Sequence, residues 1–334
     1  CVMDMYRYMH RAGEAAERLG LRANLAPYGA DRPGYEYFES VETNRRLVES
    51  HHGAADGRVR VWFGLEHLTY STDEGLRSVV EWAGKYGVGI HVHTDESLAM
   101  AQAVERKYGK REVEILYDKR LLGERTVLAH CTWLSEPEMA LVAEAGARVA
   151  HCPISNLKLG SGVAPVTEMQ RRGITVGIGS DGVKENNSLG LWDEMKVASI
   201  LQKGHRMDPT AATAPTVLRM ATQDGARALG LDEEIGSIEP GKKADLTFVN
   251  LHALHFVPVL GGEFYNVTHN LVYAAQGSDV EHVMVDGKWV VRDGALVHAD
   301  ENEIIERATF AARSLLERRK QYVPEGLKGP SEII

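Results

Sequence analysis

The sequence predicts an α/β fold, a TIM-type (β/α)8 barrel with a small β-sandwich domain appended. Three observations support this prediction. Short apolar or β-branched runs alternate with amphipathic segments as far as residue 202. Side chains that can bind a metal or transfer a proton directly follow several of these runs. After residue 203 the alternation stops, and the sequence becomes rich in turns and short strands.

The barrel strands are predicted from short apolar runs bounded by polar or turn residues. Residues 1–4 look like the end of a buried strand that has already begun, so we expect native sequence before Cys1. The seven strand–helix units are one fewer than a full barrel has, so we expect strands two to eight here. The further predicted strands cover residues 21–26, 59–64, 88–93, 126–130, 148–152 and 174–178.

Helices are predicted where apolar residues recur at helical spacing. In the first helix Tyr8, Ala12 and Ala15 share one face, and Ser135 with Glu138 forms a capping box that begins a later helix. The predicted helices of this region cover residues 5–19, 41–51, 73–86, 98–108, 113–121, 135–145, 164–172 and 189–202.

After residue 203 the predicted elements no longer alternate between strand and helix. A helix is predicted over residues 214–229, a turn-rich lead into a strand over 235–250, and a hairpin over 280–291 around an Asp-Gly turn. Residues 302–322 are predicted to be a terminal helix and residues 323–334 a loose tail. The predicted domains are a hydrolase barrel over 1–234, a small β-sandwich portion over 235–297, and a C-terminal helix and tail over 298–334.

The composition excludes several classes of protein. The chain has 334 residues, 44% of them hydrophobic, and a net charge of -9, with no basic stripe. We therefore expect no nucleic-acid partner and no membrane partner. No signal peptide is recognisable, so a cytoplasmic location is expected. Cys131 and Cys152 each directly follow a histidine, and we favour a buried apolar role over metal binding for both.

Four polar residues follow successive predicted strands. His93 ends one strand with Glu96 three residues later, His130 ends the next, and Asp181 follows the last. The carboxyl ends of parallel strands meet at one mouth of a barrel, so these side chains should converge. Taken singly, each has a structural alternative: a strand end with a helix cap, a core histidine, or an Asp-Gly turn. Together they indicate a metal-activated water that attacks a polar C–N bond.

The register of these strands follows from spacing. His91 and His93 could instead be a two-ligand pair on the first barrel strand. A strand–helix–strand unit takes roughly 30 residues, however, and Asp181 lies only 88 residues after His93. That distance fits about three units. His93 therefore belongs to the fifth strand, His130 to the sixth and Asp181 to the eighth.

These motifs resemble the amidohydrolase superfamily, in its subgroup of nucleoside and triazine aminohydrolases and chlorohydrolases. The resemblance implies that His93 and Asp181 bind one divalent metal. It also implies that Glu96 carries a proton from water to the ring and that His130 polarises the reacting centre. The motifs that carry the resemblance span residues 93–96, 129–131, 151–159, 179–182 and 235–246.

Other pocket residues are implied by the same resemblance. His67 matches a histidine that contacts substrate after the fourth strand, although the local spacing differs by about one residue from the usual pattern. Ser155 and Asn156 stand where relatives line the pocket, with a capping or turn role as the alternative. Relatives that act on S-adenosylhomocysteine bind its carboxylate with basic residues, for which Arg22 and Arg32 are the candidates.

The implied activity is hydrolytic deamination of an aminated heteroaromatic ring, an adenine nucleoside or thionucleoside, with release of ammonia. The alternatives are a pterin, a guanine analogue, or a triazine that loses amine or chloride. The implied cofactor is one divalent metal, zinc or else iron. The implied partner is a small-molecule substrate, and self-association into a homo-oligomer is left open.

One departure from the family pattern is clear. Relatives carry a His-x-His pair on the first barrel strand, which supplies two metal ligands, and no such pair precedes His93 at that position in this chain. The expectation is that the sequence is a fragment. The alternative is a metal-free relative with a structural or binding role.

Overall fold

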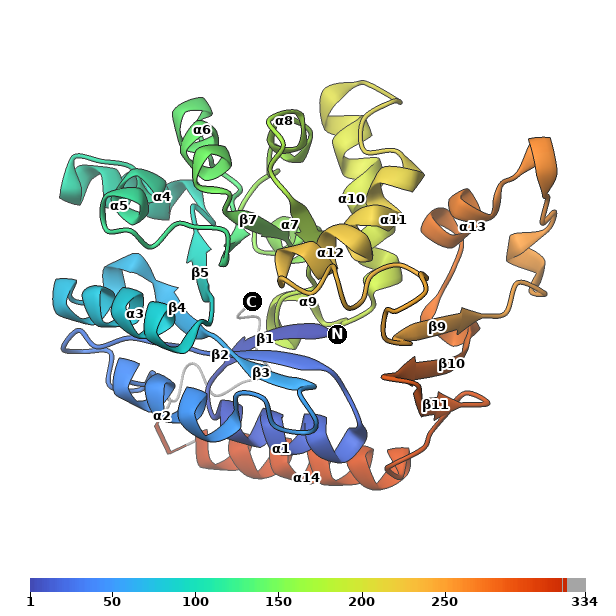
Figure 1. Ribbon diagram of the computed structural model, residues 1–334, viewed down its shortest axis with the longest axis horizontal. Coiled ribbons are helices and arrows are strands. Elements are labelled where there is room, and N and C mark those ends of the chain that lie inside the picture. Colours follow the sequence, from blue (N-terminus) through green and yellow to red (C-terminus); the bar gives the residue numbers. More distant parts are fainter. Residues whose placement is uncertain (320, 323–334) are drawn as a thin grey trace.

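The computed structural model describes residues 1–319, 321 and 322. Its interior consists of parallel strands in two sheets, ordered β1-β2-β3 and β4-β5-β6-β7-β8. Helices surround the strands, and a third sheet lies to one side (Figure 1). The parallel strands are β1 (Val2–Tyr6), β2 (Ala23–Pro27), β3 (Val59–Val61), β4 (Phe63–His67), β5 (Ile90–Thr94), β6 (Thr126–His130), β7 (Arg148–His151) and β8 (Val176–Ile178).

Only Trp62 separates β3 from β4. Strand β3 pairs with β2 while β4 pairs with β5, so this bent segment passes from one sheet to the next. Counted as one strand, it leaves seven parallel strand positions among the described residues. This number and the alternation with helices confirm the predicted barrel architecture.

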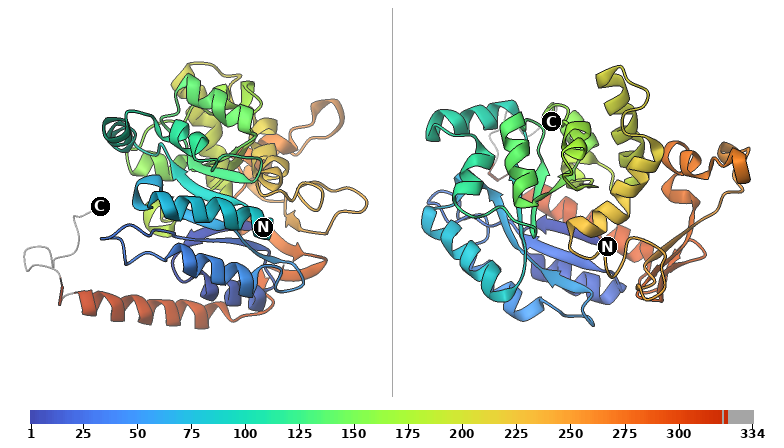
Figure 2. Two further views of the ribbon diagram at one scale, coloured as in Figure 1. Left: turned by 60° about the vertical axis from the view of Figure 1, so that its left-hand side comes forward. Right: turned by 45° about the horizontal axis from the view of Figure 1, so that its top comes forward.

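The helices cover the outside of the strands in both further views (Figure 2). The apolar faces of helices and strands meet in one large core that includes Leu25, Phe63, Val92 and Leu128. The helices are α1 (Met9–Leu19), α2 (Val41–His51), α3 (Asp73–Tyr86), α4 (Leu98–Tyr108), α5 (Glu112–Asp118), α6 (Glu136–Ala145), α7 (Pro153–Lys158), α8 (Val166–Arg171), α9 (Val183–Asn186), α10 (Leu191–Arg206), α11 (Ala214–Ala221), α12 (Gln223–Ala228), α13 (Val267–Tyr273) and α14 (Glu301–Arg319).

Most predicted elements match, and the differences have local causes. The predicted capping box of α6 is present, with the Ser135 side chain accepting from the Glu138 backbone. The helix predicted over 214–229 is broken at Thr222, whose φ of -123° and ψ of -91° are not helical. The short helices α7, α9 and α13 were not predicted, because four to seven residues are too few to show a helical period. The predicted tail over 323–334 lies outside the described residues.

Two glycines mark a close contact where the two parallel sheets meet. A Cβ atom at Gly29, just after β2, would clash with the carbonyl oxygen of Gly64 in β4. A Cβ at Gly64 would clash with the carbonyl oxygen of Pro27. The Glu66 backbone N–H donates to the Gly29 carbonyl at 3.1 Å. The end of β2 and the end of β4 are therefore fixed directly against each other.

The third sheet, at the side of the barrel, is antiparallel, and its strand order is β12-β11-β10-β9. Its strands are β9 (Leu246–Val249), β10 (Val280–Val285), β11 (Lys288–Arg292) and β12 (Ala295–Leu296). The hairpin of β10 and β11 confirms the turn predicted at Asp286 and Gly287. Between β9 and β10 the chain returns to the barrel, where α13 packs against α10 and α11. The domain boundaries at residues 234 and 297 stay predictions.

A buried ion pair connects the two parts. The Arg22 guanidinium, at the start of β2, donates to both carboxylate oxygens of Asp245 at 2.6 and 2.9 Å. The Arg22 side chain is only 1% exposed, and the pair lies at the amino end of its strand. Arg22 is therefore not available to bind substrate, and this part of the sequence interpretation is wrong. Among the described helices, none has the length and apolar character needed to cross a membrane.

We predict that Arg22→Met destabilises the protein by about 3 kcal/mol, because it leaves a buried carboxylate without its cation. Burial alone would raise the pKa of Asp245, but Arg22 and the Asp286 N–H hold it below its ordinary value of 3.8. The stabilisation is therefore present at neutral pH and is lost only as the pH falls below 3.8.

Thermal unfolding of both proteins between pH 7 and pH 3 measures this effect. The control is Arg11→Met, which breaks an ion pair whose side chains are 73% and 55% exposed and should change stability very little. Equal melting temperatures for Arg22→Met and the unsubstituted protein at pH 7 would contradict the assignment.

Candidate active site

Three buried histidines lie at the carboxyl ends of neighbouring strands: His67 on β4, His93 on β5 and His130 on β6. The His93 ring centroid lies 5.5 Å from that of His67 and 5.3 Å from that of His130. The His93 Nδ1 donates to the backbone oxygen of Glu66 at 2.8 Å. Because a carbonyl oxygen can only accept, Nδ1 carries a proton, and Nε2 is the nitrogen that would bind a cation after losing its own proton.

Glu66 completes a group with metal-ligand chemistry. Donor atoms of Glu66, His67 and His93 lie within 4.8 Å of one another. The Glu66 Oε2 and the His67 Nδ1 are buried without a hydrogen-bond partner. Two imidazoles and a carboxylate are a common ligand set for zinc, so the residues present fit a divalent cation.

A break in strand pairing puts these donors together. Between β4 and β5 the register runs from Leu65 opposite Val92 directly to His67 opposite His93, so Glu66 is skipped. Such a bulge re-aims the side chains beside it. It turns Glu66 toward His93 instead of outward, and its carboxylate lies 3.4 Å from the His93 Nδ1.

The electrostatic setting differs among the three imidazoles. Burial lowers the pKa of His67, and the neighbouring His93 and His130 lower it further. Burial and His93 also lower the pKa of His130. For His93 burial acts in the same direction, but Glu66 outweighs it and raises the pKa to about 9. The site therefore stabilises one positive charge beside Glu66.

Asp181 and His130 are both held by the short helix α7. The Asp181 backbone is left-handed, with a φ of 63°, and its carboxylate accepts from Ser155 Oγ at 2.6 Å and from the Gly182 N–H at 2.7 Å. His130 Nδ1 donates to Asn156 Oδ1 at 2.9 Å. Ser155 and Asn156 are almost completely buried. The structure thus places them as supports of Asp181 and His130.

Glu96 lies three residues after His93 and is half-buried. Its negative charge raises the pKa of both His93 and His130. Asp181 also raises the pKa of His130. The charges of Glu96 and Asp181 thus act on the histidines, but Asp181 does not belong to the metal-ligand group of Glu66, His67 and His93 found in the described residues.

A buried carboxylate cluster lies behind this group: Asp95, Glu112 and Glu138, at most 2% exposed, with Arg111 as their cation. Arg111 Nε donates to Glu138 at 2.5 Å. Burial raises the pKa of Asp95 to about 9, and the charges of Glu138 and Glu112 act in the same direction. Asp95 therefore favours its protonated form at neutral pH, which relieves the repulsion among these carboxylates.

This cluster connects the loop after β5 to the loop after β6. The Asp95 N–H donates to Glu112 at 3.0 Å, and the Asp95 carbonyl accepts from the Trp133 N–H at 3.1 Å. Arg111 donates to the Trp133 carbonyl at 2.5 Å. The backbone that carries Glu96 is therefore fixed relative to the backbone that follows His130.

Comparison with known proteins agrees with this geometry. A family model described as the amidohydrolase family matches residues 1–290. The chain belongs to the amidohydrolase family. The predicted family and the barrel class are thereby confirmed, and amidohydrolases of this kind are hydrolases.

Two curated relatives indicate the subgroup. This amidohydrolase is 40% identical to a 5'-deoxyadenosine deaminase from Methanosarcina mazei, over 94% of this chain and 72% of the relative. It is 41% identical to a 5-methylthioadenosine/S-adenosylhomocysteine deaminase from Moorella thermoacetica, over 92% of this chain and 70% of the relative.

Solved structures agree with the fold. A zinc-bound adenosine deaminase from Xanthomonas campestris has a TM-score of 0.87 and 32% identity, and the match covers 96% of this chain and 71% of the other. A zinc complex of atrazine chlorohydrolase from Arthrobacter aurescens has a TM-score of 0.83 and 25% identity, covering 92% and 72%. The neighbours therefore support a divalent metal in this amidohydrolase.

The two buried cysteines of the amidohydrolase carry no sign of metal binding. Cys131 and Cys152 are at most 5% exposed. Burial raises the pKa of both thiols well above the ordinary value, so they stay protonated. Neither belongs to the metal-ligand group found in the described part of the chain. Their environment agrees with the predicted apolar role.

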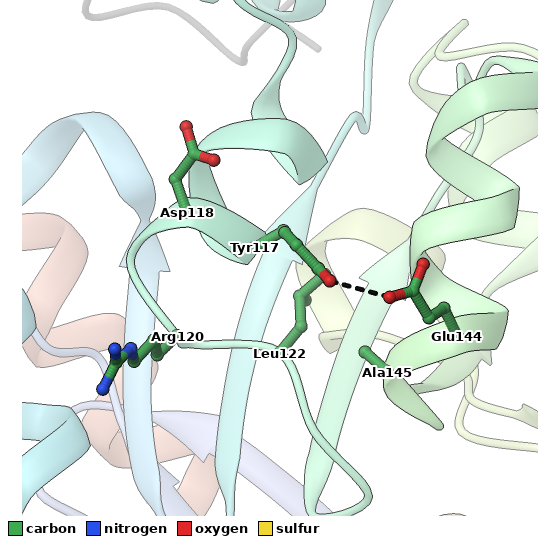
Figure 3. Close-up of a pocket in the computed structure, with 6 residues that line it drawn as sticks. All are labelled: Tyr117, Asp118, Arg120, Leu122, Glu144 and Ala145. Atoms are coloured by element: carbon green, nitrogen blue, oxygen red, sulfur yellow. Dashed lines mark hydrogen bonds between the residues drawn. The ribbon is translucent and has the colours of Figure 1, made fainter.

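One surface pocket lies elsewhere on the molecule. It is formed by the ends of α5 and α6 and the loop between α5 and β6, and the Tyr117 hydroxyl donates to Glu144 across it at 2.8 Å (Figure 3). In a βα barrel the helices run opposite to the strands, so these helix ends lie at the amino ends of the strands. The pocket is thus on the face opposite the histidines.

We predict that Glu138→Ala lowers stability by about 3 kcal/mol, since it removes the acceptor of Arg111 and of the Ser135 hydroxyl. Thermal unfolding measures the change. The control is Glu144→Ala on the same helix, where an exposed carboxylate accepts from Tyr117. Equal melting temperatures for the two variants would show that the buried cluster does not fix this region.

Proposed function

We propose that this amidohydrolase is a metal-dependent deaminase that hydrolyses an aminated heteroaromatic ring, an adenine nucleoside or thionucleoside, and releases ammonia. The observation that carries the proposal is the packing of His93 between His67 and His130, with the Glu66 carboxylate 3.4 Å from the His93 Nδ1. The relatives named above, at about 40% identity, support an adenine ring as the substrate. We further propose a cytoplasmic enzyme that acts on a small molecule, without nucleic-acid or membrane partners.

The proposed metal ligands are His93 and Asp181, with Glu66 and His67 close enough to share the cation. A bound divalent metal, zinc or else iron, supplies Lewis acidity that lowers the pKa of water. Glu96 takes the proton from the attacking water and delivers it to the ring. His67 is proposed to contact the substrate.

Neutral His130, held by Asn156, polarises the water or the ring carbon under attack. Ser155 keeps the Asp181 carboxylate turned toward the site. Water adds its oxygen to the ring carbon, the C–N bond to the amino group breaks, and ammonia leaves with the transferred proton. The product is the hydroxy or oxo form of the ring. Homo-oligomerisation remains open in this proposal.

We predict ammonia release from at least one adenosine derivative. Full-length protein supplied with zinc is assayed with adenosine derivatives, pterins, guanine analogues and triazines. Turnover of another ring and of no adenosine derivative would replace the leading substrate by that ring. No release from any ring, with metal content far below one equivalent after zinc addition, would favour a metal-free relative instead.

We predict that Glu96→Gln loses about 10²–10⁴-fold in turnover, because it removes the acid–base group while keeping its size. It should keep its metal, measured by elemental analysis, whereas His93→Ala should lose metal. Near-normal turnover of Glu96→Gln would refute the proton transfer by Glu96 and turn attention to Asp95. The carboxyl of Asp95, however, is 1% exposed and sits among Glu138 and Glu112.

A further inference from the structure

A continuous run of aromatic rings lies beside the proposed active site. Five rings, called here the aromatic wall, come from two segments that follow strand ends: Tyr28, Tyr35, Tyr37 and Phe38 after β2, and Tyr70 after β4. The Tyr35 and Tyr70 rings stack, with centroids 4.1 Å apart and an angle of 22° between their planes. Phe38 lies 5.9 Å from Tyr28 and 5.7 Å from Tyr70.

The aromatic wall reaches the proposed metal ligands at its inner end. The Tyr28 ring meets His93 edge-on at 5.8 Å, and the Tyr70 ring meets His67 edge-on at 5.2 Å. At the outer end Tyr37 contacts Phe38 at 4.3 Å and is 60% exposed. The wall therefore runs from the histidines to an exposed ring at Tyr37.

Hydrogen bonds hold the wall in place. The Asp31 carboxylate accepts from both the backbone and the side chain of Thr72, at 2.6 and 2.5 Å. Arg32 donates to the Ser71 carbonyl at 2.9 Å. The base of the loop is closed where the Ala30 N–H donates to the Glu39 carbonyl at 2.9 Å. The rings are thus ordered before any substrate arrives, which reduces the entropy lost on binding.

The charges around the wall disfavour an anionic group. Residues 28–40 and 66–72 contain the carboxylates Asp31, Glu36, Glu39 and Glu66, but only one guanidinium, Arg32. That guanidinium already donates to a backbone carbonyl. From neighbouring segments, Arg7 and the carboxylates Asp181 and Glu185 act on Tyr28, and Lys184, paired with Glu185 at 2.8 Å, acts on Glu66. Carboxylates outnumber the cations around the wall, so the surroundings of the rings disfavour an anionic group.

We propose that the aromatic wall is the specificity-determining element for the 5′ side of the nucleoside and selects a short, uncharged, apolar 5′ group. With the base at the histidines, the ribose and its 5′ substituent lie along the rings. A methyl or methylthio group gains apolar contact there. A 5′ hydroxyl gains less apolar contact with the rings. The carboxylate of an amino-acid 5′ group is repelled by the carboxylates around the wall. This inference rests on the proposed deaminase activity.

The test compares three substrates with the same base: adenosine, 5′-methylthioadenosine and S-adenosylhomocysteine. We expect kcat/KM to be about 10-fold or more higher for 5′-methylthioadenosine than for the other two, the scale of one added apolar group in an apolar pocket. Tyr35→Ala should reduce this preference about 10-fold, because it lowers kcat/KM for 5′-methylthioadenosine more than for adenosine. Tyr35→Phe should retain it, because the ring remains.

Two further measurements keep the result interpretable. Calorimetric binding of the same compounds to metal-free protein should show the same order of affinity, independent of catalysis. Tyr37→Ala, at a 60% exposed position, should fold normally and weaken the preference. The control is Tyr117→Ala, whose ring lies on the opposite face of the barrel and should leave the preference unchanged.

The outcomes separate the two proposals. Deamination of all three nucleosides at similar kcat/KM, or a preference that the wall variants do not alter, overturns the inference and leaves the proposed function standing. A higher kcat/KM for S-adenosylhomocysteine also overturns it. If no adenosine derivative binds or reacts while another ring does, the proposed function fails and the inference fails with it.

Discussion

The site depends on left-handed backbone at the strand ends. Asp95, His130, Cys131 and Asp181 have φ values of 46°, 68°, 51° and 63°, and none is glycine. Each such residue costs roughly 1 kcal/mol or more, so the surroundings must hold it. Glu112 and Trp133 hold Asp95, and the side chain of Asn156 holds His130. This strain turns the chain sharply after each strand and gathers the polar side chains at one mouth.

Charge distribution around the mouth follows from the same arrangement. Behind the loop after β5, three carboxylates share one guanidinium and retain a proton, so the region adds less negative charge than its composition suggests. In front, Glu66 lies against His93 and draws positive charge to that position. The two groups of carboxylates therefore have separate tasks. The buried cluster fixes the backbone, and the front carboxylates create the potential that favours a cation.

Sequence reasoning predicted what depends on periodicity and spacing. Helices α2, α3 and α4 and strand β6 have the predicted bounds, since their apolar periods are regular and their ends are marked by caps or glycines. The packing of His93 against His130 followed from their position after neighbouring parallel strands. The roles of Glu96 and Asp181 stay predictions. Glu66 was missed, because a one-residue slip in pairing leaves no trace in local sequence. The aromatic wall and the carboxylate cluster depend on tertiary contacts between segments far apart in sequence, which no local pattern encodes.

The close contact of Gly29 with Gly64 has an evolutionary consequence. The loop that carries three rings of the aromatic wall, Tyr35, Tyr37 and Phe38, begins at this glycine and is closed by the Ala30–Glu39 hydrogen bond. Its two ends are anchored to the barrel independently of what lies between them. Residues within it can therefore be exchanged without displacing β2 or β4. Substitutions within this loop can therefore change which substrates the enzyme accepts, while the reacting groups on the strands keep their positions.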